Sequence, residues 1–204
     1  MESPTTIKKR DSYHHGDLRA QLIEATRRLV EEKGPDHFSV SEACRVAGVS
    51  TAAPYKHFKD KNEMLQEVAM DGMQRHHQEM LAEIEPYPVG SLDRIIGLGR
   101  VYTRFAQREP GVFRLMFGLS DDHDECERLV TQGNEVYSVV KLEVARCRGS
   151  ETVGPEDEKR AFMLWSFVHG LSFLAIDGKL KDFFDPAQLE GLLIEVGARV
   201  MRDS

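Results

Sequence analysis

Apolar residues recur at helical spacing along almost the whole of this 204-residue chain. Near the N-terminus they stand three or four residues apart, at Leu18, Leu22, Ala25, Leu29 and Val30. Near the other end they do so again, at Leu189, Leu192, Leu193, Val196 and Val200. This spacing places the apolar side chains on one face of a helix, and no segment alternates as a half-buried strand does. The pattern therefore predicts an all-α fold of about nine helices.

Start and stop signals divide this pattern into separate helices. Gly34-Pro35 and Gly48 end the first two helices. Ser39 with Glu42 has the spacing of a capping box, in which each side chain satisfies a backbone N–H of the other, and Asp60 opens a similar arrangement. Helices are expected over residues 18–33, 39–48, 50–58, 60–85, 91–108, 111–117, 124–147, 155–181 and 186–202.

The charge of the chain is unevenly distributed. The net charge is −7, but residues 1–65 carry 11 Lys and Arg against 10 Asp and Glu, whereas the remaining residues carry 16 against 24. Contact with phosphates needs local positive potential rather than a basic protein overall. The distribution therefore permits DNA binding by the first third of the chain.

Other sequence features indicate a cytoplasmic protein. No window approaches the roughly 18 uninterrupted apolar residues of a membrane span, and residues 1–10 lack the apolar region of a secretory signal. Cys44, Cys126 and Cys147 are odd in number and have no C-x-x-C spacing, which argues against a disulfide framework or a thiolate zinc site. We expect no membrane partner and no cofactor.

The segment Ser39–Lys61 has the proportions of a helix-turn-helix. Two short helices flank Gly48-Val49-Ser50, where glycine can take the turn conformation and Val49 can plug the space between the helices. Pro54 and Phe58 can face the core together. The two alanines before Pro54 then face outward, and small side chains there let a helix approach base edges closely.

Pro54 leaves the beginning of the second short helix open to two interpretations. If Ser50 is the cap, Pro54 occupies the fourth helical position, whose N–H should make the first intrahelical hydrogen bond. Either Thr51 is the true cap or the opening turn is irregular.

Four motifs carry a resemblance to a known family. They are Tyr13-His14-His15-Gly16-Asp17-Leu18-Arg19, Phe38-Ser39-Val40-Ser41-Glu42-Ala43, Ala47-Gly48-Val49-Ser50, and Tyr55-Lys56-His57-Phe58 followed by Lys61. Over residues 13–65 they resemble the DNA-binding domain of the tetracycline-repressor (TetR) family. Two later runs, Glu109–Phe117 and Trp165–Gly170, resemble the C-terminal domain of the branch with a W-x-x-x-H-G signature.

The resemblance implies three parts: a flexible basic arm over residues 1–12, a three-helix DNA-binding domain over 13–65, and a helical ligand-binding and dimerisation domain over 66–204. It implies a bacterial transcription regulator that is not an enzyme and works in the cytoplasm at the nucleoid. The expected partners are a palindromic double-stranded operator, a second copy of the chain joined through the last two helices, and a small-molecule effector. Repression relieved by the ligand is the default, and activation stays open.

The resemblance also implies which residues contact DNA. Lys61 matches a lysine that meets a phosphate at the start of a helix, where the helix dipole adds to its charge. The full set is Ser39, Ser41, Thr51, Ala52, Ala53, Tyr55, Lys56, His57 and Lys61.

The alanine pair sharpens this expectation. Ala52 and Ala53 cannot hydrogen-bond to a base, so direct readout rests chiefly on Thr51 and Lys56, with Lys56 favouring guanine. We hypothesise that DNA shape supplies part of the specificity, together with the Lys8-Lys9-Arg10 arm in a narrow minor groove.

The family resemblance implies a ligand pocket within residues 90–180. Trp165 and His169 share a helix face at i, i+4 spacing. For each candidate separately, a place in the hydrophobic core is the alternative, with Gly170 letting another helix approach closely. The candidates are Phe105, Phe113, Met116, Phe117, Trp165, His169 and Phe173.

Metal binding and two other classes of protein are weighed against this interpretation. The pairs His14-His15 and His76-His77 point about 100° apart on a helix and are expected on solvated faces rather than on one ion. Asp121-Asp122-His123-Asp124 is expected to begin a helix, where carboxylates complement the dipole. A di-iron enzyme would need E-x-x-H pairs, which the sequence lacks, and a helical adaptor would not need the Thr51-to-Lys61 arrangement.

Overall fold

The computed structural model describes residues 18–118, 127–180, 185 and 188–202. These residues form eight α-helices and one 3-10 turn, with no strand among them, which confirms the all-α prediction. The elements are α1 (Leu18–Lys33), α2 (Val40–Ala47), η1 (Pro54–Lys56, the 3-10 turn), α3 (Lys61–Ile84), α4 (Leu92–Arg108), α5 (Pro110–Gly118), α6 (Glu127–Cys147), α7 (Pro155–Ile176) and α8 (Leu189–Met201). None of the described helices is long and apolar enough to cross a membrane.

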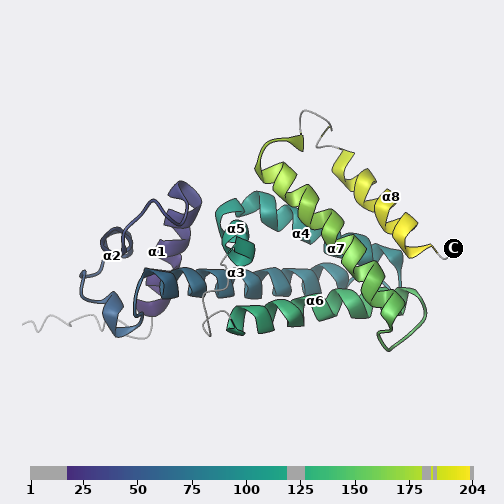
Figure 1. Ribbon diagram of the computed structural model, residues 1–204, viewed down its shortest axis with the longest axis horizontal. Coiled ribbons are helices and arrows are strands. Elements are labelled where there is room, and N and C mark those ends of the chain that lie inside the picture. Colours follow the sequence, from purple (N-terminus) through teal and green to yellow (C-terminus); the bar gives the residue numbers. More distant parts are fainter. Residues whose placement is uncertain (1–17, 119–126, 181–184, 186–187, 203–204) are drawn as a thin grey trace, which may run out of the picture.

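The first elements form a small N-terminal unit at one end of the molecule (Figure 1). It comprises α1, α2, η1 and the first turns of α3. Leu22 and Leu29 of α1 are buried in one cluster with Phe38, Phe58 and Met64. Because full burial of a large apolar side chain contributes roughly 1.5–3 kcal/mol, this cluster holds the short α2 and η1 in place.

Local hydrogen bonds set the ends of α2 and the start of α3, as expected from the sequence. The Ser39 hydroxyl accepts the N–H of Glu42 at 3.2 Å, and the Asp60 carboxylate accepts the N–H of Glu63 at 3.0 Å. Gly48 ends α2 at φ 70°, a left-handed conformation that glycine adopts without steric cost.

Of the two hydrogen bonds of the predicted capping box at α2, the one from the Glu42 N–H to the Ser39 hydroxyl forms and the reciprocal one does not. The Glu42 carboxylate, which was expected to return to the backbone of Ser39, instead accepts a hydrogen bond from Lys33 at 2.6 Å. A charged partner within reach of the carboxylate outcompetes the neutral N–H of the cap residue.

The helix predicted over residues 50–58 is also wrong, because this stretch contains only the 3-10 turn η1 between irregular turns. Pro54 has no N–H to close a helical bond to the carbonyl of Ser50. That carbonyl accepts the N–H of Ala53 at 3.0 Å instead. The irregular opening is therefore the correct one of the two interpretations of Pro54.

Helix α7 ends earlier than predicted, at Ile176 rather than near residue 181. Gly178 takes a left-handed conformation, φ 68°, that interrupts the helix two residues beyond its end. The first residues of the helix predicted over 124–147 lie outside the described residues, and α6 is described from Glu127.

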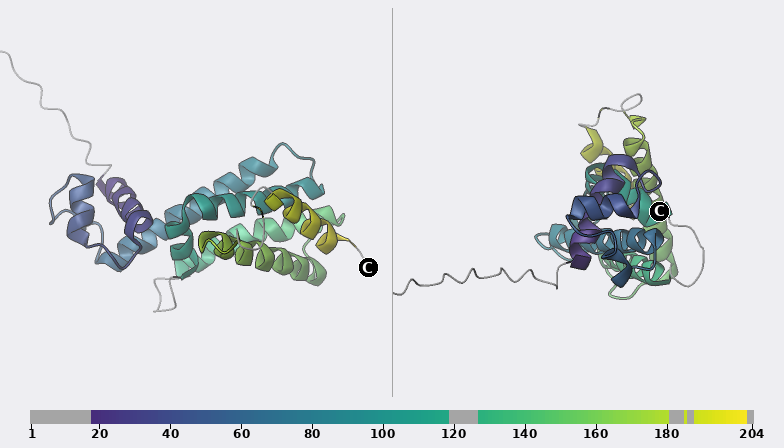
Figure 2. Two further views of the ribbon diagram at one scale, coloured as in Figure 1. Left: turned by 90° about the horizontal axis from the view of Figure 1, so that it is seen from above. Right: turned by 90° about the vertical axis from the view of Figure 1, so that its left-hand side faces the viewer.

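The larger C-terminal unit is arranged around α3 and α4. In the right-hand view of Figure 2, which looks along the long axis of the molecule, it lies behind the N-terminal unit. Helix α4 packs against α3, α7 and α8, and α6 packs against α3 and α7. Helix α5 packs tightly at two glycines. A Cβ on Gly72 of α3 would lie 2.4 Å from Val112 of α5, and one on Gly111 of α5 would lie 2.7 Å from the carbonyl oxygen of Val30 in α1.

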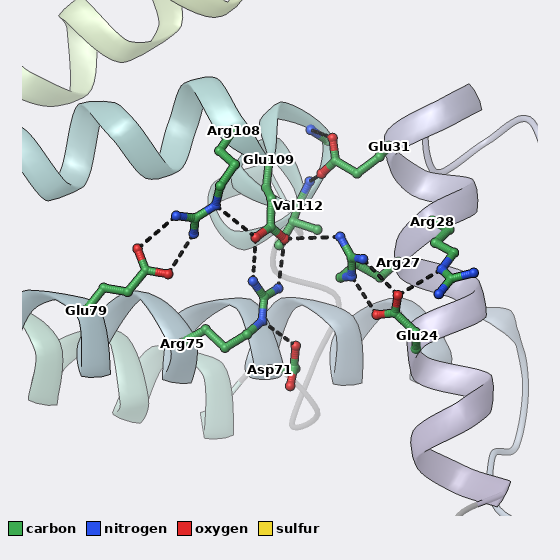
Figure 3. Close-up of polar contacts among 11 residues, drawn as sticks. Glu24, Arg27, Arg28, Glu31, Asp71, Arg75, Glu79, Arg108, Glu109 and Val112 are labelled. Carbon is green, nitrogen blue, oxygen red and sulfur yellow. Dashed lines mark hydrogen bonds and ion pairs between the residues drawn. The ribbon is translucent and has the colours of Figure 1, made fainter.

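A buried carboxylate joins the two units at the corner between α4 and α5 (Figure 3). Glu109 accepts hydrogen bonds from Arg75 of α3 at 2.5 and 2.9 Å, and Arg27 of α1 and Arg108 lie 3.5 Å away. Burial works to raise the pKa of Glu109, but the hydrogen bonds from Arg75 and the charges of the three arginines outweigh it and hold the pKa below its ordinary value. We call these four residues the Glu109 cluster.

A second carboxylate binds the first turn of α5 to α1. Glu31 of α1 accepts the N–H of Gly111 at 3.0 Å and the N–H of Val112 at 2.7 Å (Figure 3). The first N–H groups of a helix have no partner within it, and the positive end of the helix dipole favours a carboxylate there. This pair of bonds, the Glu31 clasp, fastens α5 to the N-terminal unit.

We expect Glu109→Gln to lower the free energy of unfolding by about 1–3 kcal/mol at pH 7, because the arginines then face a neutral amide in a largely buried place. The folded state holds the Glu109 carboxyl ionised, so its stabilisation is present above the ordinary pKa of 4.5 and is lost as the pH falls further. The difference between variant and wild type should therefore shrink below pH 4.5. Urea unfolding at several pH values measures both effects.

Glu79→Gln is the matched control, since Glu79 pairs with Arg108 at 2.6 Å in a more exposed position. An exposed ion pair contributes less than about 1 kcal/mol. Equal losses for the two variants would contradict the role given to the Glu109 cluster.

Candidate DNA-binding surface and ligand pocket

The N-terminal unit carries all nine residues expected to contact DNA. Buried Pro54 and Phe58 fix the turn around η1 onto the core of the unit, so the residues between and before them face outward. Six of the nine are exposed and three are partly buried: the exposed ones are Ser39, Ser41, Thr51, Ala52, Tyr55 and Lys56, and the others are Ala53, His57 and Lys61.

The irregular turn changes how these residues are presented. Thr51 and Ala52 lie on a turn before η1 rather than on a regular helix. Tyr55 follows at the tip, with 66% of its surface exposed. An aromatic ring left this exposed beside a lysine, Lys56, is available to a partner molecule.

Lys61 stands at the first position of α3 with its side chain restrained. Its ammonium lies 4.4 Å from the centroid of the Phe38 ring, a cation–π contact. The positive end of the α3 dipole lies beside it. Both features favour an anion at this point, which suits a phosphate of the DNA backbone.

Sequence reasoning missed Arg45 on α2. Its side chain is 77% exposed and makes only a 3.3 Å contact with Glu42. Arg45 follows Ser41 by four residues, so the two share one exposed face of α2. That spacing was the signal available in the sequence.

Two groups of residues considered in the sequence lie outside the described part of the chain. They are residues 1–17, with Lys8-Lys9-Arg10 and the first part of the motif that begins at Tyr13, and the acidic run Asp121–Asp124.

The C-terminal unit encloses a cavity of about 470 Å³. This volume lies within the range of small-molecule sites, about 300–1,000 Å³. All the helices of the C-terminal unit contribute to its wall, with Met73 and Met80 from α3, Ile95, Leu98 and Tyr102 from α4, Met116 and Phe117 from α5, Leu129, Val136 and Tyr137 from α6, Leu164, Trp165 and Val168 from α7, and Leu193 and Val196 from α8.

Three of the seven ligand candidates, Met116, Phe117 and Trp165, line this cavity. Phe105 and Phe113 are 0% and 1% exposed and belong to the hydrophobic core rather than to the lining. The remaining two, His169 and Phe173, contact one another edge to face outside the lining, with ring centroids 4.9 Å apart. The W-x-x-x-H spacing thus places Trp165 at the wall and His169 in contact with that wall.

A hydrogen-bonded trio connects α4 with α7 at this wall. The Trp165 indole N–H donates to the Tyr102 hydroxyl at 3.2 Å, and that hydroxyl lies 2.7 Å from Nδ1 of His169. Burial raises the pKa of Tyr102 and lowers that of His169. The hydroxyl therefore stays protonated and can donate to His169. Tyr102 was missed because nothing in its sequence neighbourhood distinguishes it from a core residue.

His76 is the third functional candidate that sequence reasoning missed, after Arg45 and Tyr102. It was expected on a solvated face with His77, but it is 2% exposed and lines the cavity, whereas His77 is partly exposed. Adjacent helical residues point about 100° apart, so only one of the pair can face inward. Burial, with the nearby charges of His77 and Arg108, lowers the pKa of His76 to about 4.

Comparison with known proteins follows the same division into two units. The family model described as "Bacterial regulatory proteins, tetR family" matches residues 22–68. The model described as "Tetracyclin repressor-like, C-terminal domain" matches residues 95–196.

Individual relatives include a curated regulator and solved structures. The HTH-type transcriptional regulator BetI of Escherichia coli is 33% identical over 76 residues, which are 37% of this chain and 39% of that protein. A solved protein of unknown function from Rhodococcus sp. RHA1 superposes with a TM-score of 0.80 at 26% identity, covering 95% of this chain and 98% of that one. A TetR-family transcriptional regulator from Streptomyces coelicolor shares the fold with a TM-score of 0.70 at 16% identity, covering 92% and 89%. The match to BetI thus spans well under half of that protein.

The two family models together cover the helix-turn-helix unit and most of the helices that enclose the cavity. Assignment to the branch with the W-x-x-x-H-G signature stays a prediction. On the evidence of both units and of the shared fold, the chain belongs to the TetR family of bacterial regulatory proteins.

Proposed function

We propose that this protein is a ligand-responsive regulator of transcription that binds a palindromic DNA operator as a homodimer, with the ligand releasing the DNA. The observation that carries the proposal is the presence of two separate sites in one chain: the exposed α2–η1 surface and the apolar cavity of the C-terminal unit. Both are binding sites, so we assign the protein no catalytic role. Its place of action is the nucleoid in the cytoplasm.

Helix α5 supports the coupling of the two sites because it lines the cavity and contacts α1, a helix of the unit that carries the α2–η1 surface. Met116 and Phe117 near its end line the cavity, and its first turn is held by the Glu31 clasp on α1. A ligand that displaces α5 would therefore tilt the N-terminal unit. In a dimer this tilt changes the distance between the two DNA-binding surfaces, which must match the spacing of the operator half-sites.

Exposed apolar side chains on α7 and α8 support dimerisation through these helices. Phe162, Ser166, Gly170 and Leu174 stand four residues apart on one exposed face of α7, and Ile194 is exposed on α8. Phe162 is 58% exposed and Leu174 is 45% exposed. A Cβ on Gly170 would meet nothing within 4 Å, so this glycine leaves room for a helix from outside the protomer. Such a face suits a four-helix interface with a second copy.

Selection of bound sites from random DNA with the full-length protein tests the DNA-binding proposal. We expect a palindromic site, and we expect Lys56→Gln to lower the affinity for that site about tenfold or more, since one base contact is worth about 1–3 kcal/mol. The preference for guanine at the contacted position should also weaken.

Lys159→Gln, on α7, is the charge-matched control and should leave DNA affinity unchanged, because Lys159 is 67% exposed in the other unit. Failure to recover any common site from the selection would refute DNA recognition itself.

Removal of residues 1–10 tests the role proposed for the arm. We expect weaker binding to the selected site and a loss of preference at positions where the minor groove is narrow, because Lys8-Lys9-Arg10 would no longer reach it. Binding curves at two salt concentrations measure the effect, and unchanged affinity and specificity would rule the arm out.

Gly170→Leu tests the dimer interface. A Cβ at this exposed position meets nothing within 4 Å, and leucine is a better helix former than glycine, so the protomer should fold. At the interface it should hold the two copies apart, giving monomers in sedimentation experiments at micromolar concentration. Ser138→Leu on the exposed face of α6 is the control and should remain dimeric. Dimers of unchanged stability with Gly170→Leu would place the interface elsewhere.

A further inference from the structure

The cavity of the C-terminal unit is unusual in having no charged side chain in its wall. Among the described residues that line it, none is Asp, Glu, Lys or Arg. Transfer of an unpaired charge from water to such a site costs several kcal/mol. The wall therefore discriminates against charged molecules.

One polar side chain in this wall has its hydrogen-bonding capacity unused. His76 of α3 is 2% exposed, and neither Nδ1 nor Nε2 has a hydrogen-bond partner. Its ring contacts those of Tyr102 and Phe105, with centroids 5.3 and 5.2 Å away. An unsatisfied buried polar group is costly, so its place in a cavity wall calls for a partner.

Tyr102, Asn134 and Tyr137 also bring polar groups to the wall, and the first of them is already paired. The hydroxyl of Tyr102, which also lines the cavity, lies between the Trp165 N–H and Nδ1 of His169. Because burial keeps the pKa of His76 near 4, its imidazole is neutral at pH 7 and offers one N–H donor and one nitrogen acceptor. A carbonyl oxygen can accept from the first, and a hydroxyl can engage either nitrogen.

We propose that the effector is an uncharged, mostly apolar molecule with an oxygen function, a carbonyl or a hydroxyl, that hydrogen-bonds to the imidazole of His76. Its apolar part lies against the methionine and aromatic side chains of the wall, such as Met73 and Phe117. The inference rests on the proposed function only in taking this cavity for the effector site. His76 thus selects among apolar molecules, and the rest of the wall excludes charged ones.

Two neutral compounds of the same shape test the role of the oxygen. Benzophenone carries a carbonyl where diphenylmethane carries a methylene. We expect isothermal titration of the full-length protein to give about tenfold tighter binding of benzophenone, the factor that a hydrogen bond of about 1.4 kcal/mol supplies. Diphenylacetate and diphenylmethylammonium, the charged counterparts, should bind at least tenfold more weakly than diphenylmethane. Quenching of Trp165, the sole tryptophan, reports whether a compound occupies the cavity.

His76→Phe keeps a ring in place and removes both nitrogens. In this variant we expect benzophenone and diphenylmethane to bind equally well, and retained binding of diphenylmethane shows that the cavity is intact. His76→Leu serves the same purpose if the phenylalanine is not accommodated.

Several results would overturn the proposal. These are equal affinities of the two neutral compounds for the wild type, a difference between them that persists in the variants, tighter binding of a charged compound, or no binding of any of the four. The selection of operator sites described above uses no ligand, so failure of the regulatory function and failure of this inference are seen separately.

Discussion

The carboxylate of Glu109 lies where three helices from two structural units meet, and its need for positive partners sets how those units are joined. Arg75 comes from α3 and Arg27 from α1, while Glu109 itself ends α4. A buried carboxylate is costly unless cations and hydrogen bonds surround it, so the three helices satisfy each other best in one relative position. Helix α3 runs through both units, and this corner and the adjacent Glu31 clasp fasten α1 of the DNA-binding unit to α4 and α5.

The same corner begins α5, the shortest helix of the C-terminal unit. Gly111 brings its backbone against Val30 of α1, and Gly72 of α3 brings Val112 equally close. Packed interiors do not deform continuously, because side chains already fill the space. We therefore expect α5 to shift as a rigid body rather than to bend. A rigid shift is what a link between a ligand pocket and a DNA-binding unit requires.

The cavity combines an apolar wall with one unsatisfied imidazole, and the two features have a common cause. Burial in a wall without charged side chains keeps the His76 imidazole neutral, and neither of its nitrogens has a hydrogen-bond partner. Buried polar groups of this kind are rare in folded proteins and are found where function requires them. The trio of Trp165, Tyr102 and His169 shows the contrasting case, since each member there is paired and serves to hold α7 against α4.

The sequence by itself determined most of the helices, several of their ends and the family, because these depend on local signals. Ser39, Gly48 and Asp60 act on residues within one turn, and the motif around Tyr55 is continuous in the chain. The missing N–H of Pro54 is an equally local signal, but the 3-10 turn that results from it was seen only in the structure.

Only the tertiary structure decided which side chains share a site. Arg27 and Glu109 are 82 residues apart, and no local pattern relates them. Helical geometry separates His76 and His77 by about 100°, so they cannot both face inward. Which of them does so depends on the packing of α4 on α3, which places His76 against Tyr102. Core and cavity wall are built from the same aromatic and methionine residues, so the distinction between Phe113 and Phe117 depends on the space that distant helices leave unfilled.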